Sequence, residues 1–267
     1  MSINFNRSRA QVYLENLIDN TYNVDSASKE QKKDFKNRVK TYTISSVDAL
    51  ALEEKLLLDA KDYFYNGLIS LIEGINNVYK KSYSWGVVKL YYSLFYACRS
   101  YMAYKKICIF RALEVFRLDV SPNSSFTGGG KEYKNTHKSV LNYFKSAFPS
   151  HYILSNEIDG SNALDWYEEV RNIVNYRASR FYEPKYLDIL KKYENGQNLI
   201  EVIQDLIKDD VGNIFIEDFA LLGIPLKFFS LMIKELSLDE NIFDSEDLDY
   251  LGALSHQNCI DLLDYLW

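Results

Sequence analysis

The sequence has 267 residues, 47% apolar and 25% charged, and this balance excludes a wholly disordered, collagen-like or coiled-coil chain. Aromatic residues make up 15% of it, and with only 4 prolines and 11 glycines the chain favours helices over a turn-rich β-sandwich. The net charge of −6 is unevenly placed, because residues 1–234 carry +3 while the nine acids from Glu235 onward have no basic residue among them. A body with a charge of +3 neither establishes nor excludes binding to nucleic acid.

The three cysteines are widely spaced and form no CxxC pair, so a disulfide scaffold and a cysteine zinc site are both disfavoured. No HExxH motif and no Glu-x-x-His helix pair occurs, and we predict neither a metal nor a cofactor. The N-terminus lacks an apolar signal core, and no run of eighteen apolar residues occurs. We therefore expect a cytoplasmic protein that does not associate with a membrane.

The first part of the chain predicts three helices. The shorter two lie at residues 8–18, which are amphipathic, and at residues 29–40, which are strongly charged. Ser45 and Ser46 then offer caps to a long helix over residues 47–79, where apolar residues recur at helical spacing.

The long helix and the segments after it contain the predicted centre of the fold. Gly67 and Gly74 lie within the long helix, where a glycine either kinks the helix or lets a neighbour approach closely. Residues 84–105 predict a helix that is apolar nearly all the way round, which is typical of a central helix. At residues 106–121 the pattern changes to β-branched and aromatic residues, and this predicts a short hairpin or an irregular insert.

Residues 121–135 are rich in loop-forming residues. They contain three glycines followed by Lys131, but no serine or threonine follows the lysine, so we reject a phosphate-binding loop in favour of a mobile surface loop. Helices are predicted over residues 136–148 and 162–181, the second ending before Pro184. Further helices are predicted at residues 185–193, 199–207, 215–222, 226–236 and 248–266.

Three local motifs lie along these predicted helices. They are Tyr-Tyr-Ser-Leu-Phe-Tyr-Ala-Cys-Arg-Ser at residues 91–100, Thr-His-Lys-Ser-Val-Leu at residues 136–141, and Trp-Tyr-Glu-Glu-Val-Arg-Asn-Ile-Val-Asn-Tyr-Arg at residues 166–177. In order and spacing the three motifs resemble the HEPN superfamily of prokaryotic helical-bundle proteins.

The resemblance covers residues 47–182 and implies an all-α fold. The expected architecture is a HEPN-like up-and-down helical bundle with a short β-like insert and a helical C-terminal extension. The chain then divides into an N-terminal helical arm at residues 1–46, the bundle at residues 47–182 and the extension, with its acidic tail, at residues 183–267.

The resemblance also implies a class of function. Many HEPN proteins are toxins, phage-defence effectors or nucleases that cleave RNA without a metal, and their signature is an arginine, a polar residue and, a few residues later, a histidine. Arg171 and Asn172 match the front of that signature, but Tyr176 or Arg177 stands where the histidine is expected, and no histidine lies between Arg171 and His256.

Two functions therefore stay open. The first is a HEPN-like protein of a prokaryotic toxin–antitoxin or anti-phage defence system that acts on or binds RNA, and that is a metal-independent endoribonuclease if it is an enzyme. The second is a non-catalytic interaction or scaffold module within a defence or regulatory complex, which the missing histidine and the acidic tail support.

Metal-free RNA cleavage needs a base for the 2′-hydroxyl, an acid for the leaving oxygen and a cation for the phosphate. Arginine suits the phosphate because it is planar, bidentate and always charged, whereas a tyrosine phenol is a poor base at pH 7. The candidate catalytic residues are therefore Arg171 for the phosphate, Asn172 for its orientation and Tyr176 as a proton donor.

The candidate RNA-binding residues are Asn175, which shares a helical face with Arg171, and Arg177, Arg180 and His137. Structural alternatives stay open for each. They are above all an ion pair of Arg171 with Glu168 or a buried acid elsewhere, a core position for Tyr176, a solvated position for the two arginines, and a helix-capping or first-turn position for His137.

Assembly follows from the resemblance as well. HEPN-like proteins usually pair so that the last helices of two bundles face each other, so we expect a homodimer with Arg171 near its two-fold axis. A partner protein from the same defence or toxin–antitoxin system is also expected. For the acidic tail two alternatives stay open: an ordinary helical cap, or a surface that turns its acids toward a basic partner or the RNA-binding groove.

Overall fold

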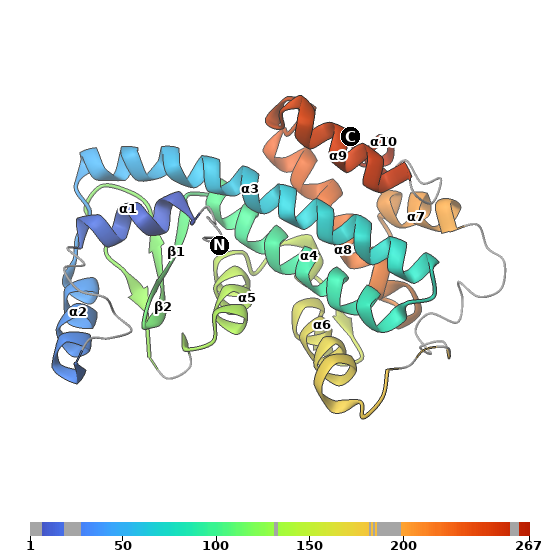
Figure 1. The fold of residues 1–267 in the computed structure, drawn as a ribbon, viewed down its shortest axis with the longest axis horizontal. Coiled ribbons are helices and arrows are strands. Elements are labelled where there is room, and N and C mark those ends of the chain that lie inside the picture. The colour runs from blue at the N-terminus through green and yellow to red at the C-terminus, as the bar shows by residue number, and fades with distance from the viewer. Residues whose placement is uncertain are drawn as a thin grey trace, which may run out of the picture. The chain divides into compact units, whose positions relative to one another are not determined.

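The computed structural model describes residues 7–18, 28–130, 133–181, 183, 185, 199–256 and 262–267 (Figure 1). Its contacts group the chain into two compact units, each built from two stretches. Unit 1 is Met1–Tyr63 with Cys98–Ala147, and unit 2 is Phe64–Ala97 with Phe148–Trp267. Helices predominate in the described residues, as the sequence predicts, while the HEPN-like bundle and the segments 1–46, 47–182 and 183–267 stay predictions.

The helices of the first 147 residues lie where the sequence places them, within one residue at each end. They are α1 (Arg9–Leu17), α2 (Lys29–Thr41), α3 (Ser46–Tyr79), α4 (Tyr83–Tyr104) and α5 (Thr136–Ala147), of which α3 and α4 contribute to both units. Serine caps explain three of the starts, because Ser8, Ser28 and Ser45 each accept a hydrogen bond from the backbone N–H three residues later.

The predicted hairpin is confirmed, but the sheet is larger than predicted. Strand β1 (Ile107–Ala112) pairs antiparallel with β2 (Glu114–Asp119), and β2 pairs with a third strand, β3 (Thr127–Gly128). The segment expected to be only a mobile loop thus supplies an edge strand. The reason is a tertiary contact: at Gly128, with φ +83°, a Cβ would lie 1.8 Å from the Tyr143 hydroxyl, so glycine alone lets the strand approach α5.

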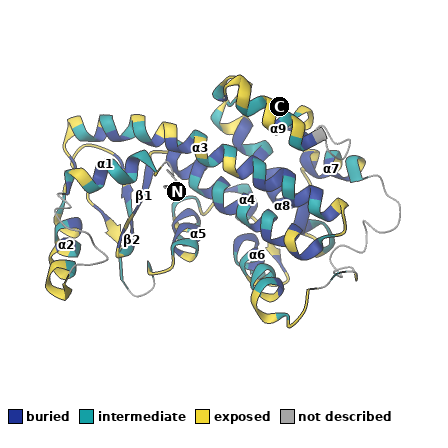
Figure 2. Cartoon of the chain, viewed as in Figure 1, coloured by how far each residue is buried: buried dark blue, intermediate teal, exposed yellow. Residues whose placement is uncertain are grey.

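The core of unit 1 lies between this sheet and the helices. Aromatic rings from the strands and the following loop meet there: Phe126 lies 5.3 Å from Phe110 and 6.3 Å from Phe116, centroid to centroid. Buried residues of α1, α2 and α3 complete the same cluster, as the dark faces of these helices in Figure 2 show. The helices therefore cover the sheet with their apolar stripes.

The second stretch of unit 2 contains a short hairpin that was not predicted from the sequence. Strands β4 (Glu157–Ile158) and β5 (Ser161–Asn162) form a two-stranded sheet just before α6 (Ala163–Asn172), and a π-helical turn, η3 (Ile173–Arg177), follows α6. The predicted helix over residues 162–181 is thus wrong at its C-terminal end, because regular α-helix stops at Asn172 and helical structure of any kind at Arg177.

The remaining helices are α7 (Leu199–Lys208), α8 (Glu217–Leu236), α9 (Ser245–His256) and α10 (Leu262–Leu266). The two helices predicted at residues 215–222 and 226–236 are one helix, α8, and the one predicted at residues 248–266 is described as α9 and α10. The helix predicted at residues 185–193 falls almost wholly outside the described residues.

Pro225 lies inside α8, at the place where two separate helices were predicted. Proline cannot donate a hydrogen bond to the carbonyl four residues before it, which here is Leu221, and an orphaned buried carbonyl normally breaks a helix. In this unit the Tyr167 hydroxyl of α6 donates to the Leu221 carbonyl. A side chain from another helix therefore satisfies the carbonyl that proline leaves unbonded, and α8 continues.

The acidic tail packs on unit 2 through its apolar residues. Phe64 of α3 lies 6.0 Å from the Phe243 ring and 6.2 Å from the Trp267 ring, and Leu251 and Leu262 are buried. The acids of the tail, in contrast, are exposed or half-buried wherever they are described. The tail is thus an integral part of the unit's core as well as an acidic surface.

The net charges of the two units differ more than the net charges of the body and the acidic tail do. Unit 1 contains 19 basic and 13 acidic residues, a net charge of +6, whereas unit 2 contains 12 basic and 24 acidic residues, a net charge of −12. A division at residue 234 along the chain gives residues 1–234 a net charge of only +3. Because each unit combines two distant stretches of chain, this separation emerges only when the chain is folded.

Two of the cysteines should resist alkylation in the folded protein. Burial raises the pKa of Cys108 to about 12 and the pKa of Cys98 well above its ordinary value, so both remain thiols at pH 8 and have little reactive thiolate. Iodoacetamide at pH 8, read by peptide mass spectrometry, should modify them only after the chain is unfolded in guanidinium. Rapid modification of either one in the native protein would contradict this burial.

Candidate functional site

The candidate residues of the last motif are positioned by α6 in unit 2. Asn162 caps this helix by accepting a hydrogen bond from the Asp165 N–H at 3.1 Å. Trp166 and Tyr167 turn into the core, where both are buried, and Tyr167 is held by the Leu221 carbonyl of α8. Because the core side of the helix is fixed in this way, Arg171 comes at the end of an anchored α-helix.

The π-helical turn η3 changes the position of Tyr176 relative to Arg171. It closes with a hydrogen bond from the Ala178 N–H to the Ile173 carbonyl at 2.9 Å. Five residues of regular α-helix would set the two side chains about 140° apart around the axis. The wider π turn instead brings the Tyr176 ring to 4.8 Å from the Arg171 guanidinium carbon. Single π turns of this kind occur frequently at functional sites.

Arg171 also contacts a second ring and one amide. Its guanidinium carbon lies 5.0 Å from the centroid of the buried Tyr91 ring of α4, and its Nη1 donates to Asn172 Oδ1 at 3.0 Å. Its Nε is buried and has no hydrogen-bond partner. Among the described residues no acid pairs with Arg171, so the alternative pairing with Glu168 is not formed, and its charge is offset only by the two rings.

The exposure of the neighbouring side chains is uneven. Tyr176 is 65% exposed, so the alternative core position is wrong and one face of its ring meets solvent. Asn175 is half-buried and Arg180 is exposed. Arg177 is exposed too, but it forms an ion pair with Glu169 at 2.5 Å, which offsets its charge.

His137 belongs to the other unit. It lies in the first turn of α5, where its backbone N–H donates to Asn135 Oδ1 at 2.9 Å, so the cap of this helix is Asn135 rather than His137. His151 is the histidine of unit 2 whose side chain the structure describes. It is buried, its ring lies 5.0 Å from the Phe228 ring, and it accepts a hydrogen bond from the Ile153 N–H.

The arrangement around Arg171 thus brings together an arginine, an asparagine and two tyrosines. These groups can bind and orient an anion, and the exposed Tyr176 ring can stack on a base. Tyr91 is the member that sequence reasoning missed as a site residue. The signal was present in the Tyr-Tyr start of the first motif, but an apolar helix surface is more often core, and Tyr91 is indeed buried.

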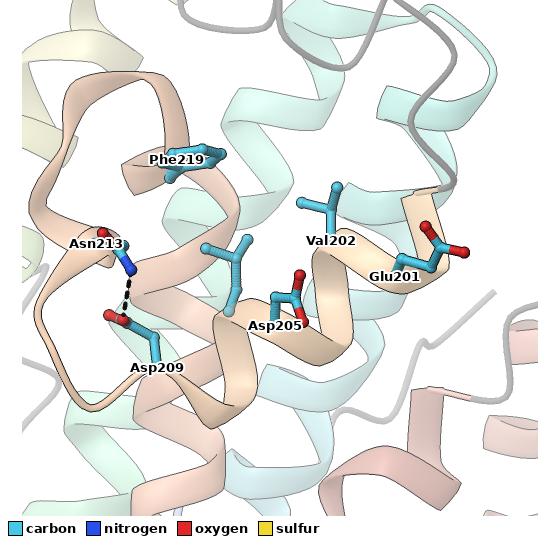
Figure 3. Close-up of a pocket in the computed structure, with 7 residues that line it drawn as sticks. Glu201, Val202, Asp205, Asp209, Asn213 and Phe219 are labelled. Atoms are coloured by element: carbon cyan, nitrogen blue, oxygen red, sulfur yellow. Dashed lines mark hydrogen bonds between the residues drawn. The ribbon is translucent and has the colours of Figure 1, made fainter.

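A separate cavity of about 340 Å3 lies between α7 and the start of α8 (Figure 3). Its lining includes three carboxylates, those of Glu201, Asp205 and Asp209. Asp209 already accepts hydrogen bonds from Asn213 Nδ2 at 3.0 Å and the Ile214 N–H at 3.1 Å, which close the loop before α8. Its charge makes this cavity unsuited to phosphate, and no group of three metal-binding side chains was found in the described ranges.

Comparison with known proteins identifies no family for this chain. No protein-family model matches the sequence, and neither the curated proteins nor the solved structures give a match. In the part of the chain that the structure describes, no helix combines the length and the apolar character that a membrane span requires.

Proposed function

We propose that the protein is a cytoplasmic, HEPN-like protein of a prokaryotic toxin–antitoxin or anti-phage defence system, and that it binds RNA through Arg171 and its neighbours. The observation that carries the proposal is the state of Arg171, whose guanidinium lies against two tyrosine rings and pairs with no described acid. A cation held in this way is available to a phosphate.

The neighbours of Arg171 supply the other contacts that RNA needs. In the proposal Asn172 and Asn175 orient the phosphate, the exposed ring of Tyr176 stacks on a base, and Arg177, Arg180 and His137 contact the backbone. The net charge of +6 on unit 1 attracts polyanions at long range, whereas the −12 of unit 2 opposes it locally. We therefore expect modest, strongly salt-dependent affinity.

The enzymatic form of the proposal is a metal-independent endoribonuclease. Arg171 would stabilise the charge on the phosphate, Asn172 would orient it, and the Tyr176 hydroxyl would be the proton donor in place of the histidine of the HEPN signature. The charge of unit 2 favours the second candidate, a non-catalytic interaction module. A unit with a net charge of −12 and an exposed acidic tail is suited to a basic protein partner.

Arg171→Ala is expected to weaken RNA binding about tenfold, because it removes one charge-assisted phosphate contact. The measurement is fluorescence anisotropy of a labelled single-stranded RNA at fixed, low salt. Lys80→Ala is the matched control, since it removes one exposed positive charge from the same unit outside the candidate site. Equal losses in the two variants would indicate a non-specific charge effect and contradict the proposal.

Incubation of the protein with total RNA and tRNA in EDTA separates the candidate functions. Cleavage that Arg171→Ala abolishes would support the endoribonuclease, and binding without cleavage would support an RNA-binding protein. Neither binding nor cleavage would leave the interaction module as the function.

A homodimer with Arg171 near its two-fold axis is part of the proposal. Isologous contact would place two copies of the motif together and double the local positive charge. Light scattering at tens of micromolar should give twice the mass of the chain, and a cysteine introduced at Tyr176, whose exposed ring lies 4.8 Å from the Arg171 guanidinium carbon, should form a disulfide across the axis under mild oxidation. A monomer, or a dimer in which this cysteine does not cross-link, would contradict the expected interface.

A further inference from the structure

Unit 1 contains a pocket of about 660 Å3 whose charge differs from that of the cavity in unit 2. Its described lining includes three arginines, Arg7, Arg99 and Arg111, and one acid, Glu15. Glu15 is already engaged, since it pairs with Arg7 at 2.7 Å and accepts a hydrogen bond from Gln11 Nε2 at 2.8 Å. The formal charges of these four side chains sum to +2.

The Arg99 guanidinium and the Arg111 backbone are both held in place at this pocket. The Arg99 guanidinium carbon lies 3.9 Å from the centroid of the Tyr63 ring, and its Nη2 donates to the Tyr63 hydroxyl at 2.5 Å. Arg111 is held through its backbone, because the Gln11 side chain accepts from its N–H and donates to its carbonyl, each at 2.9 Å. Because the Arg99 guanidinium is held in advance, it loses little entropy when a ligand arrives.

A hydroxyl group adds to these charges. Thr136, the first residue of α5, lines the pocket, and its Oγ1 is buried and has no hydrogen-bond partner. A buried hydroxyl without a partner is costly, and an oxyanion in the pocket would satisfy it. The N-terminal end of α5 also carries the positive end of the helix dipole, which favours an anion at the same place.

One part of the wall is apolar and includes a strained residue. Leu113, at the turn between β1 and β2, lines the pocket with φ +67°, a conformation that leucine rarely adopts. Glycine would form this turn without strain, so the side chain is retained at a cost in stability. Strain of this kind is concentrated at binding sites. Ile109 and Ala112 continue the same apolar wall.

We propose that this pocket binds a small organic phosphate ester. The phosphate lies against Arg99, Arg111 and the Thr136 hydroxyl, and the apolar body of the ester lies against Leu113 and its neighbours. The volume falls within the range of about 300–1,000 Å3 that is usual for small-molecule sites. The inference does not depend on RNA binding at Arg171, since Arg171 belongs to unit 2 and does not line this pocket.

The test is isothermal titration of the full-length protein with phenyl phosphate, which combines a phosphate and an apolar ring. We expect saturable binding that is at least about tenfold tighter than that of inorganic phosphate, and no binding of benzyl alcohol, which lacks the charge. Absence of saturable binding at millimolar phenyl phosphate would overturn the proposal. Inorganic phosphate binding as tightly as the ester would overturn the assignment of the apolar wall.

Two variants locate the binding. Arg111→Gln should weaken phenyl phosphate binding about tenfold, whereas Lys40→Gln, which removes an exposed charge from α2 of the same unit, should leave it unchanged. Leu113→Gly should also weaken binding while the thermal midpoint stays the same or rises, because glycine relieves the strain.

The remaining outcomes decide against the site. Equal losses in Arg111→Gln and Lys40→Gln would overturn it. Displacement of phenyl phosphate by an unmodified RNA without a terminal phosphate would assign the pocket to nucleic acid and overturn the small-molecule proposal.

Discussion

Asp59→Ala is expected to lower the free energy of unfolding by about 4 kcal/mol, because it leaves several buried donors without an acceptor. The Asp59 carboxylate is 1% exposed and accepts hydrogen bonds from the Ser8 hydroxyl at 2.6 Å, the Arg9 N–H at 2.8 Å and the Ala10 N–H at 2.9 Å. These are the first groups of α1, so one side chain of α3 caps that helix and fixes it to the core of unit 1.

The matched control for this prediction is Asp62→Ala, one turn further along α3. The Asp62 side chain is 53% exposed and pairs with Arg9, so its removal should cost at most about 0.5 kcal/mol. Urea unfolding followed by circular dichroism measures both variants, and Asp59→Asn, which keeps one acceptor oxygen, should fall between them. Similar midpoints for Asp59→Ala and Asp62→Ala would refute the capping role of Asp59.

Gly74→Val is expected to destabilise the protein by about 3 kcal/mol, because there is no space for a side chain at this position. A Cβ at Gly74 would lie 2.7 Å from Leu90 Cγ and 3.2 Å from the Leu90 backbone nitrogen, so α3 and α4 approach each other closely there. Of the two roles that the sequence allowed for this glycine, the close approach is the one the structure shows. The cost comes from moving one helix backbone, which a change of rotamer cannot avoid.

Gly252→Ala is expected to stabilise the protein, in contrast to Gly74→Val. Gly252 lies within α9, and a Cβ added there would meet nothing within 4 Å. Alanine has the higher helix propensity, so the substitution should stabilise unit 2 by about 0.5–1 kcal/mol. In thermal unfolding, Gly74→Val should therefore lower the midpoint and Gly252→Ala should raise it. A loss of stability in Gly252→Ala would contradict the open environment described for α9.

The positions of the helices in the first 147 residues could be predicted from the sequence for a local reason. Apolar spacing and serine caps are properties of neighbouring residues, and Ser45 forms the cap that the sequence suggests, as Ser8 and Ser28 also do in the structure. The hairpin at residues 106–121 was predictable on the same grounds, because β-branched and aromatic residues favour paired strands. Exposure of the tail's acids follows from their charge.

The candidate site was predictable only in part. The sequence identified Arg171, Asn172 and Tyr176 as a group. The contact between Arg171 and Tyr176, however, depends on a π turn that no local sequence pattern predicts. The partnership with Tyr91 joins residues eighty positions apart, and the pocket at Arg99 and Arg111 draws on α1, α4, β1 and α5 together. Such sites arise from contacts between distant segments.

By itself the sequence determined that this chain is mainly helical, where most of its helices begin, and that its C-terminal acids lie at the surface, since each of these depends on neighbouring side chains and on the cost of burying charge. The tertiary structure alone decided that α8 passes through Pro225, because the hydroxyl of Tyr167 reaches the Leu221 carbonyl. It also decided that basic and acidic residues divide into units of +6 and −12, because each unit is assembled from two separate stretches of chain.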